Sequence, residues 1–247
     1  GLVSMPLLVG IDEAGYGPLL GPLVVASSSW RVPEALVDAS LWGVLRGCVG
    51  RSGARGDAVL QVDDSKRVFN RERGISTLER PVLAFAQAAG LRCDTLEALL
   101  EALGSPAPEP PRRAPWEQRL DHPLPVGGPA SACEHVAQRL VRTLARVSVV
   151  LDGLAAQVVA PHRFNQRLAT TRNKAAVLLE PVLVLIEAAL RRPTEPLACV
   201  RVVRLGGRAD YRELLAQSFP QRRLEVLEQS ESASRYHLRD GDSCWTI

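Results

Sequence analysis

The stretch Leu7–Ala26 reads LLVGIDEAGYGPLLGPLVVA, and it decides most of what can be expected of the fold. Leu7–Ile11 is a short apolar run that leads into two adjacent acids, Asp12 and Glu13. A loop rich in glycine follows, and a second apolar run closes the stretch at Leu19–Ala26. Two apolar runs around such a turn predict two strands joined as a hairpin that opens the domain.

Asp12 and Glu13 are the strongest candidates for chemistry. Carboxylates at the end of an apolar strand are costly unless something compensates their charge, and a hard divalent cation does so. Neighbouring strand residues point to opposite faces, so the two could share one metal only through a twist, a bulge or a backbone contact. Gly15 and Gly17 lack side chains, which lets a sugar or phosphate approach main-chain N–H groups. The alternative is an ordinary hairpin turn with two solvated acids.

The remainder of the chain predicts helices that alternate with strands. Helical patterns occupy residues 34–45, 67–89, 94–103, 132–145, 164–190 and 210–218, with a kink or break expected at Pro181. Strands are expected at 147–151 and 200–203, with a final antiparallel pair at 223–227 and 235–238. Because the opening hairpin is antiparallel, these elements predict an α/β fold with a mixed sheet flanked by helices.

Residues 105–130 are rich in proline and show no periodicity, which favours an exposed insertion or loop. The 247 residues can bury a substantial core, and we expect one domain, 1–247, that contains this insertion.

Composition narrows the class of protein. Apolar residues make up 46% of the chain and charged residues 23%, a globular balance. The longest apolar run, Val177–Leu190, is too short and too polar to span a bilayer, so no membrane association is expected. The five cysteines form no CxxC pair, which favours reduced thiols in a cytoplasm. A net charge of +3 permits nucleic-acid binding without arguing for it.

Three motifs, in order along the chain, resemble those of the type-2 ribonuclease H family. Gly10–Val25 is similar to the opening motif, G-I-D-E-A-G-R-G-P with a nearby G-P-hydrophobic run. Asp64-Ser65-Lys66 resembles the second motif, D-S-K, at the start of a helix. Val147–Leu190 resembles the strand and long helix that follow, with Phe164-Asn165 in the matching place.

The resemblance implies a ribonuclease H-like fold. It also implies cleavage of RNA in RNA–DNA hybrids, or at single ribonucleotides embedded in duplex DNA, with Mg²⁺ or Mn²⁺ held by four acids. Asp12 and Glu13 match the first two of these acids, as catalytic residues and metal ligands. The substrate-binding residues that the resemblance implies contact the ribose 2′-hydroxyl or a phosphate, and they are Gly15, Tyr16, Gly17, Ser65 and Lys66.

The chain departs from the family pattern at several places. Tyr16 stands where the family has an arginine, and a tyrosine cannot neutralise a phosphate. The slot of the third acid, after the long helix, is held by Val203. The fourth acid would lie beyond Ile247, so the C-terminal part of the family domain is expected to be missing. Asp152 is one candidate substitute, and the weaker ones are Asp210, Asp240 and Asp242.

Two functions therefore remain open. The first is a metal-dependent endoribonuclease, and the second is a catalytically weak or inactive relative that binds nucleic acid or a protein partner. Two or three further acids close to Asp12 would favour the enzyme, because Mg²⁺ needs several oxygen ligands. A nucleotide-binding P-loop is excluded, since the chain has no GxxxxGK[ST] motif.

Overall fold

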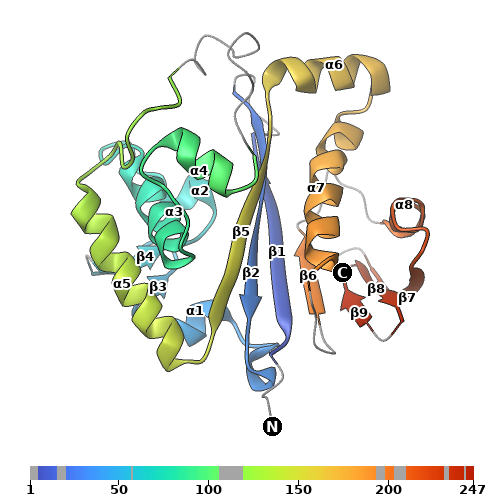
Figure 1. The fold of residues 1–247 in the computed structure, drawn as a ribbon, viewed down its shortest axis with the longest axis horizontal. Coiled ribbons are helices and arrows are strands. Elements are labelled where there is room, and N and C mark those ends of the chain that lie inside the picture. The colour runs from blue at the N-terminus through green and yellow to red at the C-terminus, as the bar shows by residue number, and fades with distance from the viewer. Residues whose placement is uncertain are drawn as a thin grey trace. The chain divides into compact units, whose positions relative to one another are not determined.

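The predicted hairpin is present and lies in the middle of a mixed sheet (Figure 1). Strand β1 (Leu7–Ala14) pairs antiparallel with β2 (Leu23–Arg31) along its whole length. On its other edge β1 pairs parallel with β6 (Ala198–Val202). The prediction of a central first strand beside an antiparallel second strand is confirmed.

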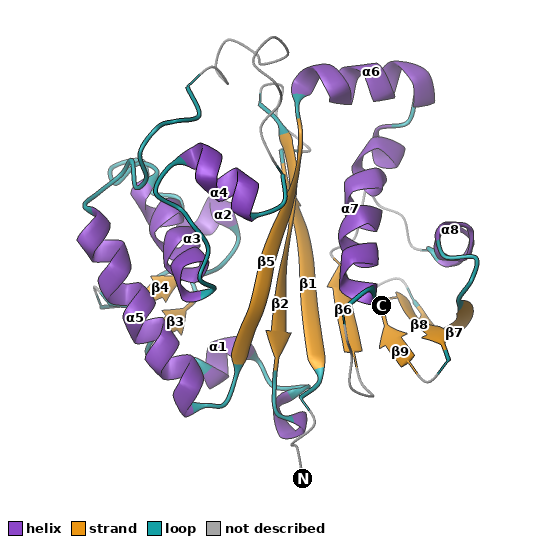
Figure 2. Cartoon of the chain, viewed as in Figure 1, coloured by secondary structure: helices purple, strands orange, loops and turns teal. Residues whose placement is uncertain are grey.

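In the part of the chain that the structure describes, seven strands form this sheet in the order β5-β2-β1-β6-β9-β8-β7. Strand β5 (Val150–Val159) begins later and runs further than the strand predicted at 147–151. Strand β9 (Ser243–Thr246) is parallel to β6 and antiparallel to β8 (Ser234–Asp240). The predicted final antiparallel pair is confirmed, because β8 pairs antiparallel with β7 (Arg223–Gln229). The chain is thus α/β, with a mixed sheet flanked by helices (Figure 2).

The computed structural model describes residues 5–15, 21–56, 58–105, 119–192, 198–202, 210–230, 234–241 and 243–247. Two compact units divide the chain, one formed by residues 1–37 with 155–247 and the other by residues 38–154. That these units make one domain of the ribonuclease H type stays a prediction.

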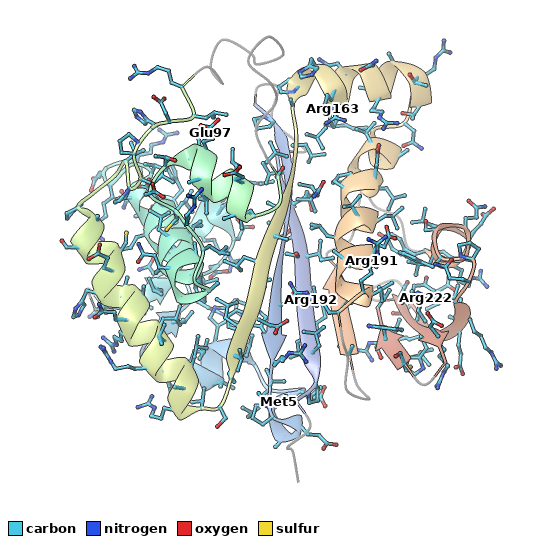
Figure 3. All side chains as sticks on the ribbon, in the orientation of Figure 1. Met5, Glu97, Arg163, Arg191, Arg192 and Arg222 are labelled. Carbon is cyan, nitrogen blue, oxygen red and sulfur yellow. The ribbon has the colours of Figure 1, made fainter. Side chains whose placement is uncertain are left out.

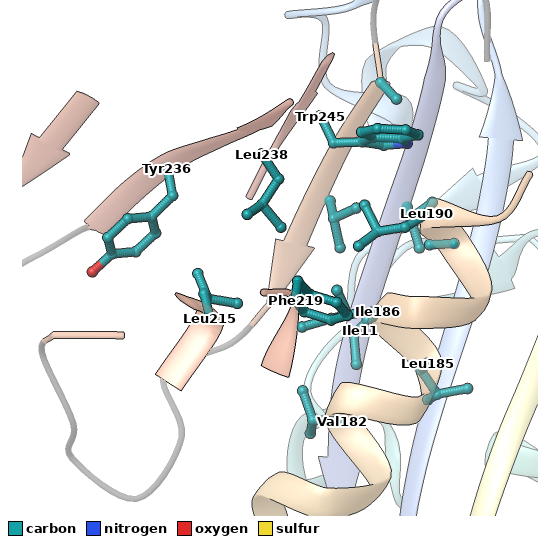
Figure 4. Close-up of a cluster of buried hydrophobic side chains, with 14 of the residues drawn as sticks. Ile11, Val182, Leu185, Ile186, Leu190, Leu215, Phe219, Tyr236, Leu238 and Trp245 are labelled. Atoms are coloured by element: carbon teal, nitrogen blue, oxygen red, sulfur yellow. The ribbon is translucent and has the colours of Figure 1, made fainter. Parts of the chain in front are cut away.

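Helix α7 (Lys174–Leu190) packs against β1 and β2 in the first unit. The buried residues of β1 alternate along the strand, as expected for a sheet with one face against a helix. Figure 4 shows the resulting cluster, in which side chains of α7 meet those of the strands and of α8 (Arg212–Ser218). Burying one large aliphatic side chain contributes about 1.5–3 kcal/mol, so this cluster holds the sheet and the helix together. Its members include Leu7, Val9, Ile11, Val182, Ile186, Leu215, Leu238 and Trp245.

The helix predicted over 164–190 is two helices, and the break does not lie at Pro181. Helix α6 (Pro161–Thr171) ends where Arg172 adopts a left-handed conformation with φ of 50°. Asn173 then caps α7, because its side-chain oxygen accepts hydrogen bonds from the N–H groups of the next turn at 3.0 and 3.2 Å. Pro181 lies buried inside α7, where it removes one backbone donor without ending the helix.

Helices α3 (Ser76–Ala88) and α5 (Ala130–Arg146) pack together in the second unit. Their core is joined by α4 (Leu96–Ala102), and buried members are Leu83, Ala86, Cys93, Leu99 and Cys133. Two short parallel strands, β3 (Val49–Gly50) and β4 (Leu60–Gln61), form a separate sheet. All three predicted helices, at 67–89, 94–103 and 132–145, thus have counterparts in this unit.

Two of the predicted helices are interrupted by polar turns. The helix expected at 34–45 is a 3₁₀ turn, Glu34–Leu36, followed by the short α1 (Leu41–Val44). The helix expected at 67–89 is divided into α2 (Ser65–Val68) and α3. The division follows from Asn70, whose side-chain oxygen accepts the backbone N–H groups of Glu72 and Arg73 at 2.8 and 3.2 Å and so turns the chain.

The proline-rich insertion is described only in part, since residues 106–118 lie outside the described residues. Over residues 119–129 the chain forms no helix or strand apart from one isolated bridge between Thr95 and Pro123. The prediction of irregular structure is confirmed for these residues. Among the helices that the structure describes, none is both long and apolar enough to cross a membrane.

Candidate functional site

The two predicted metal ligands lie on the last residues of β1. Asp12 is exposed and Glu13 is half-buried, and each is paired in the regular ladder with β2, opposite Ala26 and Val25. The ladder contains no bulge at this point, so the two side chains leave the strand toward opposite faces. The bulge that would bring both carboxylates to one ion is therefore not part of β1.

A short hydrogen bond orients the Asp12 carboxylate. Its Oδ1 atom accepts the backbone N–H of Glu13 at 2.7 Å, which leaves the second oxygen, Oδ2, for another partner. The Asp12 side chain is thus held against the strand it belongs to. A cation bound by Asp12 would therefore not meet the Glu13 carboxylate on the same face of the strand.

Glu13 is the acid whose ionisation the structure disfavours. Burial raises the pKa of the Glu13 carboxyl above its ordinary value, and the negative charge of Asp12 raises it further. A hydrogen bond to the backbone opposes this shift in part. A bound cation would favour the charged form of Glu13, so a proton and a cation would compete at this position.

Gly15 is required where it stands, directly after β1. Its φ is +88°, and a Cβ atom added to it would lie 2.2 Å from the carbonyl oxygen of Pro22. A residue with a side chain does not fit there, so the backbone at Gly15 lies directly against the start of β2. Tyr16 and Gly17, which the resemblance assigns to the substrate, lie outside the described residues.

The second motif is exposed and starts α2 in the other unit. The side chain of Asp64 caps this helix by accepting the backbone N–H of Lys66 at 2.8 Å, and both Ser65 and Lys66 are exposed. A D-S-K sequence is therefore explained locally as a helix cap followed by two solvent-facing side chains. That Ser65 and Lys66 line one cleft with Asp12 stays a prediction.

The positions proposed for the third and fourth acids do not yield a ligand in the described residues. In the parallel pair of β1 and β6, Ile11 lies opposite Val202, and Val203 lies outside the described residues. Asp152 belongs to β5, at the edge of the sheet beyond β2. Within the described ranges, no three side chains of His, Cys, Asp or Glu are grouped so that they could hold a metal ion.

The negative charge of Asp210 is stabilised by hydrogen bonds within the protein. Its carboxylate accepts hydrogen bonds from the Arg212 guanidinium at 2.8 and 3.1 Å, and the Tyr236 hydroxyl lies 3.4 Å away. The side-chain and backbone hydrogen bonds from Arg212, followed by a side-chain hydrogen bond from Gln229, hold the pKa of Asp210 far below its usual range. Asp240 is exposed on β8, and Asp242 lies outside the described residues.

Helix α6 lies at the end of the sheet where β1 ends (Figure 1), and its basic residues are His162, Arg163 and Arg167. None of its residues is buried, and Arg163 projects from it (Figure 3). Arg167 forms an ion pair with Glu180 of α7, with 2.7 Å between Nη2 and Oε1. Asn165, the residue in the matching place of the family helix, is exposed. The acidic pair and a solvent-facing basic helix thus occupy the same end of the first unit.

Sequence reasoning missed four arginines that meet at one cavity of the second unit. They are Arg46, which follows α1, and Arg139, Arg142 and Arg146 of α5. The signal was present, because the three residues of α5 are spaced by three and four positions, the spacing of one helix face.

Comparison with known proteins adds nothing to this geometry. No family model matches the chain, and no match was found among curated proteins or solved structures.

Proposed function

We propose that this protein is a metal-dependent endoribonuclease of the type-2 ribonuclease H kind. It would act on the RNA strand of RNA–DNA hybrids or at ribonucleotides embedded in DNA, with Mg²⁺ or Mn²⁺. The observation that carries the proposal is the pair Asp12–Glu13 at the carboxyl end of the central strand β1, shortly before Gly15, which lies against the start of β2.

The donor atoms at this site fit a hard divalent cation. Two carboxylates offer oxygen ligands, and Mg²⁺ is commonly bound through one or two carboxylates together with water and substrate phosphates. The raised pKa of Glu13 also fits, since a cation at this position would offset the repulsion from Asp12. When bound, such an ion supplies an activated water and neutralises charge on the scissile phosphate.

The chain's own residues would hold the ion and position the nucleotide. Asp12, exposed and with Oδ2 free of the bond to Glu13, would hold the ion from the open face of β1. Glu13, which leaves β1 toward the opposite face, would hold a second metal ion or orient the nucleotide. The glycine at position 15 brings main-chain groups close to the strand end, where they can meet a ribose 2′-hydroxyl.

A second function is favoured by a specific observation. Asp12 and Glu13 point to opposite faces of β1, and no third acid joins them in the described part of the chain. A protein with this arrangement would bind nucleic acid through its basic surfaces and cleave it weakly or not at all.

One assay separates the two functions. The protein is incubated with a labelled RNA–DNA hybrid and with a duplex that contains one ribonucleotide, each with Mn²⁺, with Mg²⁺ and with EDTA. The enzyme is supported by metal-dependent cleavage that Asp12→Asn removes and that Asp121→Asn, an exposed acid of the other unit, leaves intact. Binding of the hybrid without cleavage supports the second function.

A further inference from the structure

The four arginines of the second unit border a cavity of about 430 Å³. Its remaining lining is Gly47, Cys48 and Thr143, so no carboxylate of the described residues lines the cavity. A cavity of this size with several positive charges and no acid is suited to an anion larger than a halide ion.

Local structure explains why the arginines converge. Arg139, Arg142 and Arg146 lie on one face of α5, because residues three and four positions apart are neighbours on a helix. Arg139 is half-buried and donates a hydrogen bond from Nη2 to the carbonyl oxygen of Gly47 at 2.6 Å. This bond ties the loop that carries Arg46 to α5, so the fourth arginine is brought to the same cavity.

Three of these guanidinium groups are available to a ligand. Arg46, Arg142 and Arg146 are exposed, and none of them forms an ion pair or a side-chain hydrogen bond with any residue that the structure describes. Arg167 and Arg212 differ, since both are paired with acids. The cavity therefore concentrates unneutralised charge.

We infer that this cavity binds consecutive phosphates of a nucleic-acid backbone. Arginine presents a planar fork of donors that matches phosphate oxygens in pairs. The span from Arg139 to Arg146 is about 10 Å along the helix axis, from a rise of 1.5 Å per residue. One phosphate does not fill that span, whereas each strand of a nucleic-acid duplex places a phosphate at about every 3.4 Å of the helix axis. The cavity and the helix face next to it thus fit a polyanion better than a single phosphate ion.

This inference shares with the proposed function only its nucleic-acid ligand, and it needs neither metal nor cleavage. The test is therefore a binding measurement in EDTA. Fluorescence anisotropy of a labelled RNA–DNA hybrid is followed against protein concentration at several salt concentrations. The pocket variant is Arg142→Gln with Arg146→Gln, which leaves the Arg139–Gly47 bond in place.

The matched control removes the same charge from the same unit. Arg71 and Arg73 are exposed, lie in the turn before α3 and do not line the cavity, so Arg71→Gln with Arg73→Gln changes the net charge equally. The pocket variant should bind the hybrid at least about fivefold more weakly, with a salt slope lower by about two, since each phosphate contact contributes about one. The control should change the affinity by less than about twofold.

A third variant keeps the charge and removes the fork. Arg142→Lys with Arg146→Lys should lose an intermediate part of the affinity, because lysine contacts phosphate as a point charge. Circular dichroism shows whether the double glutamine variant folds. If it does not fold, the double lysine variant takes its place in the binding measurement. Competition with inorganic phosphate distinguishes the source of the ligand.

The inference is overturned if the pocket and control variants lose the same affinity, because net charge alone would then explain the effect. It is also overturned if inorganic phosphate binds in a pocket-dependent way while the hybrid does not. A hybrid that binds through the pocket and is never cleaved supports this inference and counts against the proposed nuclease.

Discussion

This protein has two sites that contain like charges, one on strand β1 and one on helix α5, and the side chains of the two sites are arranged differently. On β1, the adjacent acids Asp12 and Glu13 leave the strand toward opposite faces. On α5, Arg139, Arg142 and Arg146 are separated along the chain yet share one face and one cavity. Neighbours in sequence are thus divided by a strand, and residues three or four apart are gathered by a helix.

The difference decides what each site can do without help from elsewhere. The arginine cavity already presents converging donors to an anion. The acidic pair presents one exposed and one half-buried carboxylate, and a cation there needs further oxygen ligands from water or substrate. The anion site is therefore preformed, whereas the cation site depends on what binds to it.

The largest effect is expected from removing the exposed acid. Asp12→Asn keeps the volume of the side chain and removes its charge, so metal-dependent cleavage of the hybrid should fall by at least about a hundredfold. Hybrid binding in EDTA should be unchanged, because the binding proposed for α5 lies in the other unit. Full Mn²⁺-dependent cleavage by Asp12→Asn, measured against Asp121→Asn, would rule out the acidic pair as the catalytic site.

The next effect concerns the turn that ends β1. Gly15→Ala would place a Cβ atom 2.2 Å from the Pro22 carbonyl oxygen, at a φ of +88°. We expect a loss of about 2–4 kcal/mol in the free energy of unfolding, measured by urea denaturation. Gly21→Ala is the matched control, since Gly21 has a φ of +97° but nothing within 4 Å of an added Cβ. Equal losses for both variants would mean that backbone strain, and not the close approach to β2, fixes the turn.

Sequence periodicity predicted the elements well wherever burial imposed it. The apolar run Leu7–Ile11 and the helical spacing over 132–145 both correspond to observed elements, because each buries one regular face. Failures occurred where a single polar side chain redirects the backbone. Asn70 divides one predicted helix, and Asn173 starts α7 after the left-handed Arg172. Periodicity does not report such local hydrogen bonds, and it overrated Pro181 as a breaker.

Only those features of the candidate site that depend on residues close together in the sequence could be predicted. The position of Asp12 and Glu13 at the end of a strand, and the need for Gly15, follow from neighbouring residues. The convergence of Arg46 with α5 depends on a hydrogen bond between residues 47 and 139, which no local pattern encodes. Long-range packing therefore produced the site that sequence reasoning missed.

A smaller effect tests the half-buried acid through pH. The pKa of Glu13 is raised in the folded protein, so the folded state binds this proton more tightly than the unfolded chain does. Stability from this group is present below the ordinary pKa of a glutamate and is lost as pH rises through the raised value. Glu13→Gln should therefore be more stable than the wild type at neutral pH, by less than about 1 kcal/mol, and should show no such loss on raising the pH.

Thermal denaturation between pH 4 and pH 7 measures this difference, with Glu72→Gln of an exposed turn as the control. Adding Mn²⁺ should raise the Tm of the wild type and leave that of Glu13→Gln less affected, since the ion competes with the proton. A Glu13→Gln variant that is less stable at pH 7 would show that the carboxylate makes a favourable interaction in the folded state.

The smallest effect tests whether the arginines of α5 repel one another. Arg142 lies three residues after Arg139 and four before Arg146, and it has no acidic partner in the described part of the chain. Like charges at these spacings destabilise a helix by about 0.2–0.5 kcal/mol per pair, while glutamine and arginine have similar helix propensities. Arg142→Gln should therefore raise the free energy of unfolding slightly at low salt, and the gain should vanish at high salt. In the presence of the hybrid the wild type should be the more stable of the two proteins, because only the wild type makes all of the phosphate contacts. A variant that is less stable at low salt without any ligand would mean that Arg142 already has a partner in the free protein, and the cavity would then not be a preformed anion site.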